Sequence, residues 1–391
     1  MKLAYYLLDG ERHWGSVDVA GGTIRRIGGA FEDWAPEATA KGSKVIDLEG
    51  SAINLADVKL LPPVIPGSEI IGTGINYASW AIPPEGADTC FEFKSTTAMA
   101  GMDDTLRFPQ IIDAQPKCEY RYEIELGVVI GIGMEEPTDE GIKHLLGYTI
   151  FNDGCLRGQR PSYVSFDWTG SKCGYQASSV GPWIATRDEF GDGQPDLAMI
   201  TRTNGVITTS GRSGGMKLDL NELLRELSWR TALSPGDIFF TGTPGYEGIP
   251  DGVMSPGDDY EFEIEGIGVL RNKVEIRNKP PGLPEGLESL TPADVPGLGA
   301  DLRKWDGTDV FYIKQILEKM QAADPDDTTG WKADSRSYLM SVNTDAWPEG
   351  SQTETIEWWA IDTARRRIYR MSGQEIFATG YFPHRREGGT A

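Results

Sequence analysis

The stretch that decides the fold is YRYEIELGVVIGIG, residues 120–133, followed by LLGYTIFND, residues 145–153. Both runs are apolar and rich in β-branched residues, which predicts two strands. Glu123 and Glu125 stand two residues apart, so their side chains point to the same face of a strand. Asp153 stands where the second strand should end. Three carboxylates at one place repel one another unless a cation lies between them, and oxygen ligands select Mg²⁺, Mn²⁺ or Ca²⁺.

A second interpretation of the same run is a sheet with one ordinary solvated face. Polar residues alternate with Tyr120, Tyr122, Ile124 and Leu126 in this run, which is also the pattern of a half-exposed strand. The polar positions are Glu119, Arg121, Glu123 and Glu125. The residues of this run alone leave both interpretations open.

Bulk properties bound the class of protein. A chain of 391 residues is long enough for two to three domains. Its net charge of −22 disfavours nucleic acid and anionic membranes as partners, because phosphate-binding faces need clustered Lys and Arg. No apolar run reaches the roughly 18 residues that span a membrane. The four cysteines show no metal-ligand spacing, so we expect reduced thiols in a cytoplasmic protein.

The pattern along the chain predicts a mainly β fold of mixed α+β type. Residues 1–66 indicate a small N-terminal β module with turns at Asp9-Gly10 and Gly21-Gly22. Residues 67–280 carry many β-branched runs broken by Gly and Pro, which favours a large barrel or roll as the catalytic domain. Two stretches in it have helical patterns, residues 138–147 and 219–233.

Residues 281–391 begin with a Pro/Gly-rich linker and continue as a C-terminal α+β extension. We expect a helix at 309–323 and antiparallel strands at 355–362, 365–373 and 374–382. The segment is rich in aromatic residues for its size. Such an excess usually covers a neighbour, so we expect the extension to pack on the catalytic domain or across a dimer.

Several motifs, in this order, resemble the fumarylacetoacetate hydrolase family. They are GINY at 74–77, FEFK ending at Lys94, YEIEL at 122–126, GYTIFND at 147–153, GSK ending at Lys172, and LSPGDIFFTGTPG at 233–245. The resemblance implies the β-roll of that family, a homodimer, and a small-molecule substrate that is a 2-oxo acid or a 1,3-dicarbonyl acid.

The resemblance also implies roles for individual residues. Glu123, Glu125 and Asp153 would hold the divalent ion, which stabilises an enolate of the substrate. Lys172 would be a catalytic group near the substrate carbonyl, with a pKa lowered by the ion. The remaining matched positions would bind substrate; they are Thr243 and Gly242 of the TGTP loop, Tyr77, Lys94 and Arg157.

The sequence departs from that family where a His–Glu pair is expected to activate water. Trp80 stands at the His position and Pro83 at the Glu position, and neither is a general base. Glu85 of the same loop is the candidate replacement. The resemblance favours a C–C bond hydrolase or related lyase, whereas the missing pair favours a hydratase or dehydratase, a decarboxylase or a tautomerase. A non-catalytic, ligand-binding homologue is the further alternative.

Overall fold

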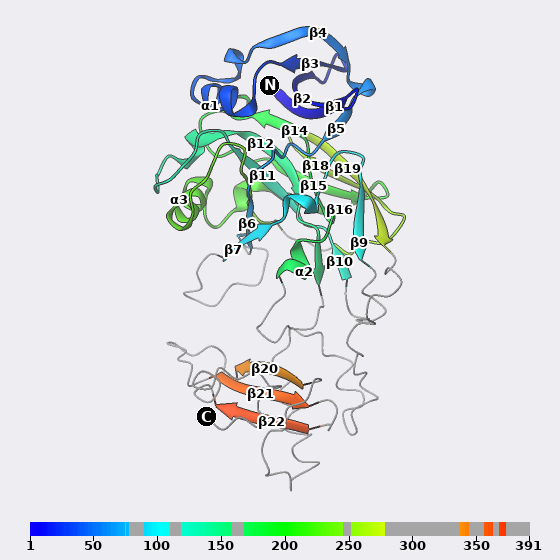
Figure 1. The fold of residues 1–391 in the computed structure, drawn as a ribbon, viewed down its shortest axis with the longest axis vertical. Coiled ribbons are helices and arrows are strands. Elements are labelled where there is room, and N and C mark those ends of the chain that lie inside the picture. Colours follow the sequence, from blue (N-terminus) through cyan, green and yellow to red (C-terminus); the bar gives the residue numbers. More distant parts are fainter. Residues whose placement is uncertain are drawn as a thin grey trace. The chain divides into compact units, whose positions relative to one another are not determined.

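The computed structural model describes residues 1–74, 76–77, 90–109, 119–157, 168–244, 252–277, 337–343, 356–362 and 367–372 (Figure 1). The chain divides into two compact units. The first comprises Met1–Gln110, Glu119–Arg157 and Trp168–Asn278, and the second Ile111–Cys118, Gly158–Asp167 and Lys279–Ala391. Strands far outnumber helices among the described elements, which confirms the expected mainly β fold. In these described ranges, no helix has the length and apolarity needed to cross a membrane.

The first unit is built on a twelve-stranded sheet. Its main path runs β4-β3-β2-β1-β14-β12-β11-β17-β6-β7, with β5 paired to β1 and β8 paired to β14. The strands are β1 (Lys2–Leu8), β2 (Glu11–Asp18), β3 (Thr23–Ile27), β4 (Leu48–Asn54), β5 (Lys59–Leu61), β6 (Ile70–Gly74), β7 (Cys90–Lys94), β8 (Met99–Ala100), β11 (Ile124–Ile130), β12 (Leu145–Asn152), β14 (Ser178–Thr186) and β17 (Ile238–Phe240). Strands β11 and β12 are neighbours at its centre, and every residue in both is buried.

The N-terminal strands extend this sheet, because β1 pairs with β14. The β1–β2 turn is formed by Asp9 and Gly10, both with positive φ, as the Asp-Gly pair predicts. Helix α1 (Phe31–Lys41) follows β3 and was not predicted, because Pro36 interrupts the helical pattern in the sequence. Tertiary packing stabilises it: Phe31 and Trp34 contact Trp14 with ring centroids 5.1 and 5.7 Å away.

A five-stranded sheet packs on the central strands. Its order is β16-β15-β18-β19-β9, and β18 and β19 contact β12. The strands are β9 (Thr105–Pro109), β15 (Ala198–Thr203), β16 (Val206–Arg212), β18 (Asp259–Ile264) and β19 (Gly268–Arg277). Tyr122 lies against this sheet, with its ring centroid 5.6 Å from that of Tyr260 and 5.8 Å from that of Phe262. The residues just before β11 are therefore covered by a second layer.

One of the two expected helices is present. Helix α3 (Leu220–Arg230) has the capping box that its sequence predicts, with Asp219 as N-cap and Glu222 at the third position. The helix expected at 138–147 is wrong, because only Gly141–His144 forms a 3₁₀ turn and Leu145 already begins β12. Pairing with β11 and burial of the leucines outweigh the local propensity. The other helical elements are α2 (Trp168–Lys172) and the 3₁₀ turns Ser43–Val45, Leu55–Asp57, Thr96–Ala98, Arg187–Glu189 and Ser213–Gly215.

The described part of the second unit is one antiparallel sheet of β20 (Ser337–Asn343), β21 (Ile356–Asp362) and β22 (Arg367–Ser372). It confirms the strands expected at 355–362 and 365–373, and β20 was not predicted. The strand expected at 374–382 and the helix expected at 309–323 lie outside the described residues. Packing of this extension on the rest of the protein stays a prediction.

Candidate metal and reaction centre

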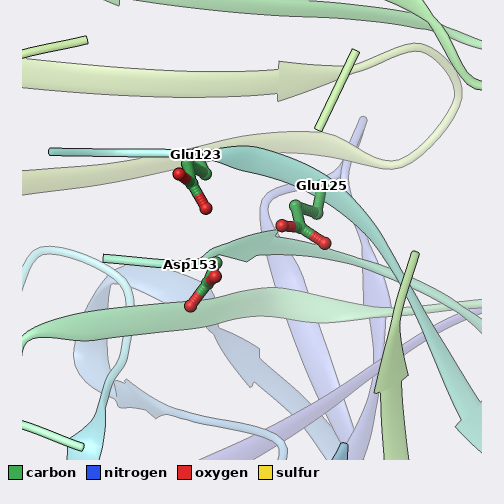
Figure 2. Close-up of side chains that lie close together, drawn as sticks. All are labelled: Glu123, Glu125 and Asp153. Atoms are coloured by element: carbon green, nitrogen blue, oxygen red, sulfur yellow. The ribbon is translucent and has the colours of Figure 1, made fainter. Parts of the chain in front are cut away.

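Three carboxylates converge because of the register between β11 and β12. Ile124 pairs with Asn152, which places Glu123 opposite Asp153, and the Asp153 N–H donates to the Glu123 carbonyl at 2.8 Å. The Asn152 side-chain oxygen accepts from the Glu123 N–H at 3.2 Å and fixes the same corner. Figure 2 shows the side chains of Glu123, Glu125 and Asp153 turned toward one shared space. One carboxylate oxygen from each of the three residues lies within 4.8 Å of the other two.

This face of the sheet is buried, so the solvated-face interpretation is wrong. Glu123, Glu125 and Asp153 are 5%, 2% and 1% exposed. The second sheet and the TGTP loop cover the end of β11, which alternation in one strand cannot reveal. Buried carboxylates are costly unless they are paired, protonated or bound to a cation.

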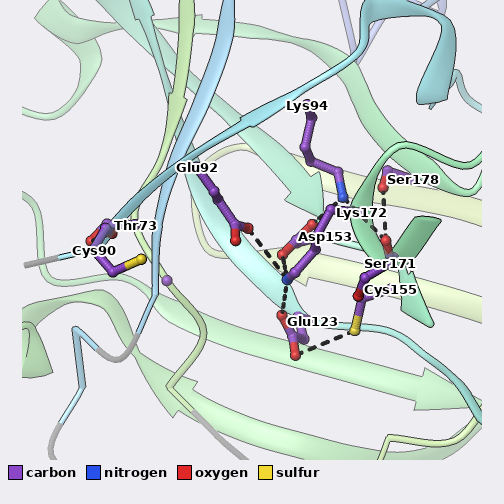
Figure 3. Close-up of polar contacts among 12 residues, drawn as sticks. Thr73, Cys90, Glu92, Lys94, Glu123, Asp153, Cys155, Ser171, Lys172 and Ser178 are labelled. Atoms are coloured by element: carbon purple, nitrogen blue, oxygen red, sulfur yellow. Dashed lines mark hydrogen bonds and ion pairs between the residues drawn. The ribbon is translucent and has the colours of Figure 1, made fainter. Parts of the chain in front are cut away.

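Two buried lysines balance part of the negative charge (Figure 3). The Lys172 ammonium, at the end of α2, bonds Asp153 and lies 3.1 Å from Glu123 Oε2 and 3.3 Å from Glu92 Oε1. The Lys94 ammonium bonds Asp153 and donates to the Gly154 carbonyl at 3.1 Å. Asp153 is thus shared by both lysines.

Glu125 is held by a backbone donor from the loop after β17. The Gly242 N–H donates to Glu125 Oε2. Gly242 has φ +88°, a conformation that only glycine adopts readily, and a Cβ there would lie 3.3 Å from Asn76 Cβ. The Asn76 side chain accepts from the Leu218 N–H and donates to the Thr241 carbonyl, which anchors the loop. The glycine of TGTP therefore orients a carboxylate of the cluster itself.

Charges in the cluster shift the pKa values of its members. Burial, with the negative charges of Asp153 and Glu123, raises the pKa of Glu125 well above its usual range. Burial also acts to raise the pKa of Asp153, but the ammonium groups of Lys172 and Lys94 outweigh it, and that pKa is lowered. Burial opposes the charge of Lys172, yet the surrounding carboxylates raise its pKa well above the ordinary value. The surrounding carboxylates therefore raise the pKa of Lys172, whereas a bound cation would lower it.

The donor set fits a divalent cation. Four buried carboxylates, those of Glu92, Glu123, Glu125 and Asp153, face two buried ammonium groups. If all were ionised, two negative charges would be left, which one divalent ion neutralises. Carboxylate oxygens are the ligands that Mg²⁺, Mn²⁺ and Ca²⁺ prefer. Glu123, Glu125 and Asp153 are the residues that could hold the ion.

The predicted substrate-binding residues have different positions. Tyr77 is buried and makes a β-bridge with Met216; burial, with the nearby charges of Glu125 and Asp196, raises its pKa despite the opposing hydroxyl of Thr241. Thr243 is buried one residue beyond Gly242. Arg157 pairs through its backbone with Glu119 in the short ladder of β10 (Glu119–Arg121) and β13 (Cys155–Arg157). Glu85, Trp80 and Pro83 lie outside the described residues.

Sequence reasoning missed Glu92, the fourth carboxylate of the cluster. It lies on β7 two residues before Lys94, and both side chains are buried. The signal was in the FEFK motif, where residues two apart share a strand face. Strand β7 pairs with β6 next to β17, and this tertiary arrangement brings it to the end of β11.

The histidines and cysteines supply no described nucleophile–imidazole pair. His144 contacts the Ile132 and Gly133 carbonyls at 3.2 Å, and His13 lies 3.8 Å from Glu11; His384 is outside the described residues. The buried Cys155 thiol donates to Glu123 Oε1 at 3.6 Å. Cys155 therefore belongs to the packing around a carboxylate of the cluster.

Comparisons with known proteins agree with this architecture. The family described as fumarylacetoacetate (FAA) hydrolase C-terminal matches residues 70–275. An uncharacterised protein of Staphylococcus saprophyticus is 33% identical over 248 residues, which are 61% of this chain and 77% of that protein.

Two solved enzymes also share the fold of this chain. A 5-carboxymethyl-2-hydroxymuconate delta-isomerase from Mycobacterium smegmatis is 28% identical with a TM-score of 0.58. A fumarylacetoacetate hydrolase from Exiguobacterium antarcticum is 27% identical with a TM-score of 0.56. Each alignment covers 71% of this chain and all of the other. From the matched family region and the shared fold, the chain belongs to the fumarylacetoacetate hydrolase family.

Proposed function

We propose that this protein is a divalent-cation-dependent enzyme that acts on a small 2-oxo acid or 1,3-dicarbonyl acid. The observation that carries the proposal is the buried group of Glu123, Glu125 and Asp153, which offers one oxygen from each residue within 4.8 Å of the others, beside the Lys172 ammonium. When bound there, Mg²⁺, Mn²⁺ or Ca²⁺ would supply Lewis acidity toward carbonyl and carboxylate oxygens of the substrate.

The chain's own residues have separate tasks in this proposal. The Gly242 N–H and the Asn152 side chain fix Glu125 and the backbone of Glu123, so the acidic cluster is preorganised. The Lys172 ammonium stabilises negative charge that develops on a substrate oxygen. Lys94 bonds Oδ1 of Asp153, whereas Lys172 bonds Oδ2, so the two lysines together hold this carboxylate in place.

Several reaction types are candidates, and the comparisons support two of them. The likeness to an enzyme named a fumarylacetoacetate hydrolase supports C–C bond hydrolysis. Isomerisation or tautomerisation is supported by the likeness to an enzyme named a delta-isomerase, and by Trp80 and Pro83 at the positions where water-activating residues were expected. Decarboxylation and hydration need the same cation and proton transfer, and they belong in the same test.

We further propose a homodimer, which light scattering after size-exclusion chromatography would test.

The test combines calorimetry with a substrate panel. Mg²⁺ is titrated into the metal-free protein and into Glu125→Gln and Asp153→Asn, with Asp259→Asn as the matched surface control. Asp259 is exposed and pairs with Lys273 at 3.2 Å. Acylpyruvates, oxaloacetate and 2-keto-3-deoxy sugar acids are then incubated with and without Mg²⁺, and products are identified by NMR.

We expect tight binding by wild type and Asp259→Asn, at least tenfold weaker binding by the two cluster variants, and turnover that requires the ion. Equal affinity in all four proteins would refute the metal assignment. Metal binding without turnover on any panel member would favour the non-catalytic ligand-binding alternative.

A further inference from the structure

Glu92 lies at the edge of the acidic cluster, beside the Lys172 ammonium. The three carboxylates that could share an ion are Glu123, Glu125 and Asp153, and Glu92 is not in that group. Its carboxylate instead faces the Lys172 ammonium, with Oε1 3.3 Å from Nζ (Figure 3). Glu92 pairs with Gly72 of β6, and this register fixes the position of the Glu92 Cα.

The four carboxylates differ in how firmly they are held. Glu125 accepts from the Gly242 N–H, and Asp153 is bonded by both lysines. Glu123 accepts from Lys172 and from the Cys155 thiol. Glu92 has Lys172 as an ionic partner, through Oε1 at 3.3 Å from the ammonium.

We propose that Glu92 is the proton-transfer residue of this centre, taking a proton from the substrate carbon next to the carbonyl and returning one to carbon. The inference rests on the proposed function. In the first step the C–H bond breaks, its electron pair enters the C=C bond of a substrate enolate, and the carboxylate becomes a carboxylic acid. In the second step the enolate pair forms a new C–H bond and the carboxylate is regenerated. When the proton returns to a different carbon of the conjugated enolate, the two steps isomerise the substrate; when it returns to the same carbon after exchange with solvent, the net result is hydrogen exchange, and neither outcome needs a co-reactant.

The electrostatic surroundings suit this role. Burial, with the charges of Asp153 and Glu123, raises the pKa of Glu92 to about 7, while the ammonium groups of Lys172 and Lys94 oppose the shift. A group whose pKa lies near neutral pH can both accept and release a proton there. The facing groups come from β7, from α2, from the residue before β11 and from the residue after β12, so the environment is set by the fold.

No described imidazole is placed to do the same work. His144 contacts the Ile132 and Gly133 carbonyls, and His13 lies near Glu11 on β2. Glu92 is thus the carboxylate near Lys172 that is neither shared by two lysines nor a member of the group that could hold the ion.

The experiment follows exchange of the methyl protons of pyruvate with D₂O by NMR, in the presence of Mg²⁺. The variants are Glu92→Gln and Glu92→Asp, with Glu263→Gln as the control, because Glu263 is a partly exposed residue paired with Arg202 on the second sheet. Calorimetric Mg²⁺ affinity and melting temperature are measured on the same samples as readouts independent of turnover.

We expect Glu92→Gln to lower the exchange rate at least 100-fold with Mg²⁺ affinity within threefold of wild type. Glu92→Asp should retain more activity than Glu92→Gln, and Glu263→Gln should match wild type. Exchange by Glu92→Gln within threefold of wild type would overturn the role of Glu92 and leave the proposed function standing. A tenfold loss of Mg²⁺ affinity in Glu92→Gln would make Glu92 a ligand and overturn it as well. Absence of both Mg²⁺ binding and exchange in wild type would overturn it together with the proposed function.

Discussion

Replacing Lys172 with Met tests the electrostatic account of the centre most directly. The Met side chain keeps much of the apolar stem of Lys but removes the ammonium that contacts Glu92, Glu123 and Asp153. Lys172 is 6% exposed, so solvent cannot replace the lost charge at little cost. In the metal-free protein, Lys172→Met leaves Lys94 as the one described ammonium that contacts these carboxylates.

The expected magnitude follows from the burial of these groups. Removing one partner of a buried ion pair typically costs about 3–5 kcal/mol. Protonation of Glu92 and Glu125, whose pKa values are raised, relieves part of the repulsion, so we expect about 3 kcal/mol at pH 8. A divalent ion at 100 times its Kd stabilises wild type and variant alike by about 2.7 kcal/mol, so only tighter binding by the variant narrows the stability gap. Since Lys172 and the ion compete for Asp153 and Glu123, the variant should bind Mg²⁺ at least as tightly as wild type.

The assay is urea unfolding of wild type and Lys172→Met, each with EDTA and with saturating Mg²⁺, beside calorimetric titration. The matched control is Lys59→Met, because Lys59 is 57% exposed and pairs with Asp104 at 2.9 Å. A surface pair of this kind is worth at most about 1 kcal/mol. Mg²⁺ should narrow the stability gap for Lys172→Met by about 1.4 kcal/mol for each tenfold by which the variant binds the ion more tightly, and it should leave the gap for Lys59→Met unchanged. If Lys172→Met were as stable as wild type in EDTA and bound Mg²⁺ more weakly, the reasoning would be wrong.

Two other measurements follow from the same geometry. In the folded metal-free protein Glu92 has a pKa of about 7, whereas in the unfolded chain its pKa is the ordinary 4.5, so between these two pH values only the folded protein keeps the proton. Stability should therefore fall as pH rises, by roughly 3 kcal/mol from this group, and Glu92→Gln should show a shallower fall in urea unfolding. Gly242→Ala should cost about 1–3 kcal/mol and weaken Mg²⁺ binding, because its φ is +88° and its N–H holds Glu125. The control is Gly191→Ala, because Gly191 has φ +85° and a Cβ there would have no atom within 4 Å. It should show the backbone strain without any change in Mg²⁺ affinity. Equal Mg²⁺ affinity in both variants would contradict the role of the Gly242 N–H.

Much of the fold could be predicted because its signals are local. The runs at 120–133 and 145–153 contain β11 and β12, the Asp9-Gly10 turn joins β1 and β2, and the capped pattern at 219–233 contains α3. Strand alternation and capping act over a few residues, so the sequence carries them directly. Helix α1 and the wrong helix at 138–147 show the limit, since packing on Trp14 creates the first and pairing with β11 prevents the second.

For the centre, the sequence by itself determined which residue types are present: the Glu123–Glu125 pair on one face, Asp153 at a strand end, and the glycine that the TGTP loop requires. Only the tertiary structure decided that this face is buried, that Lys172 and Lys94 share Asp153, and that Glu92 joins them from β7. The physical reason is that burial and charge pairing depend on which strands become neighbours. Strand β17 is far in the chain from β6 and β11, between which it lies, and these pairings depend on the packing of the whole sheet.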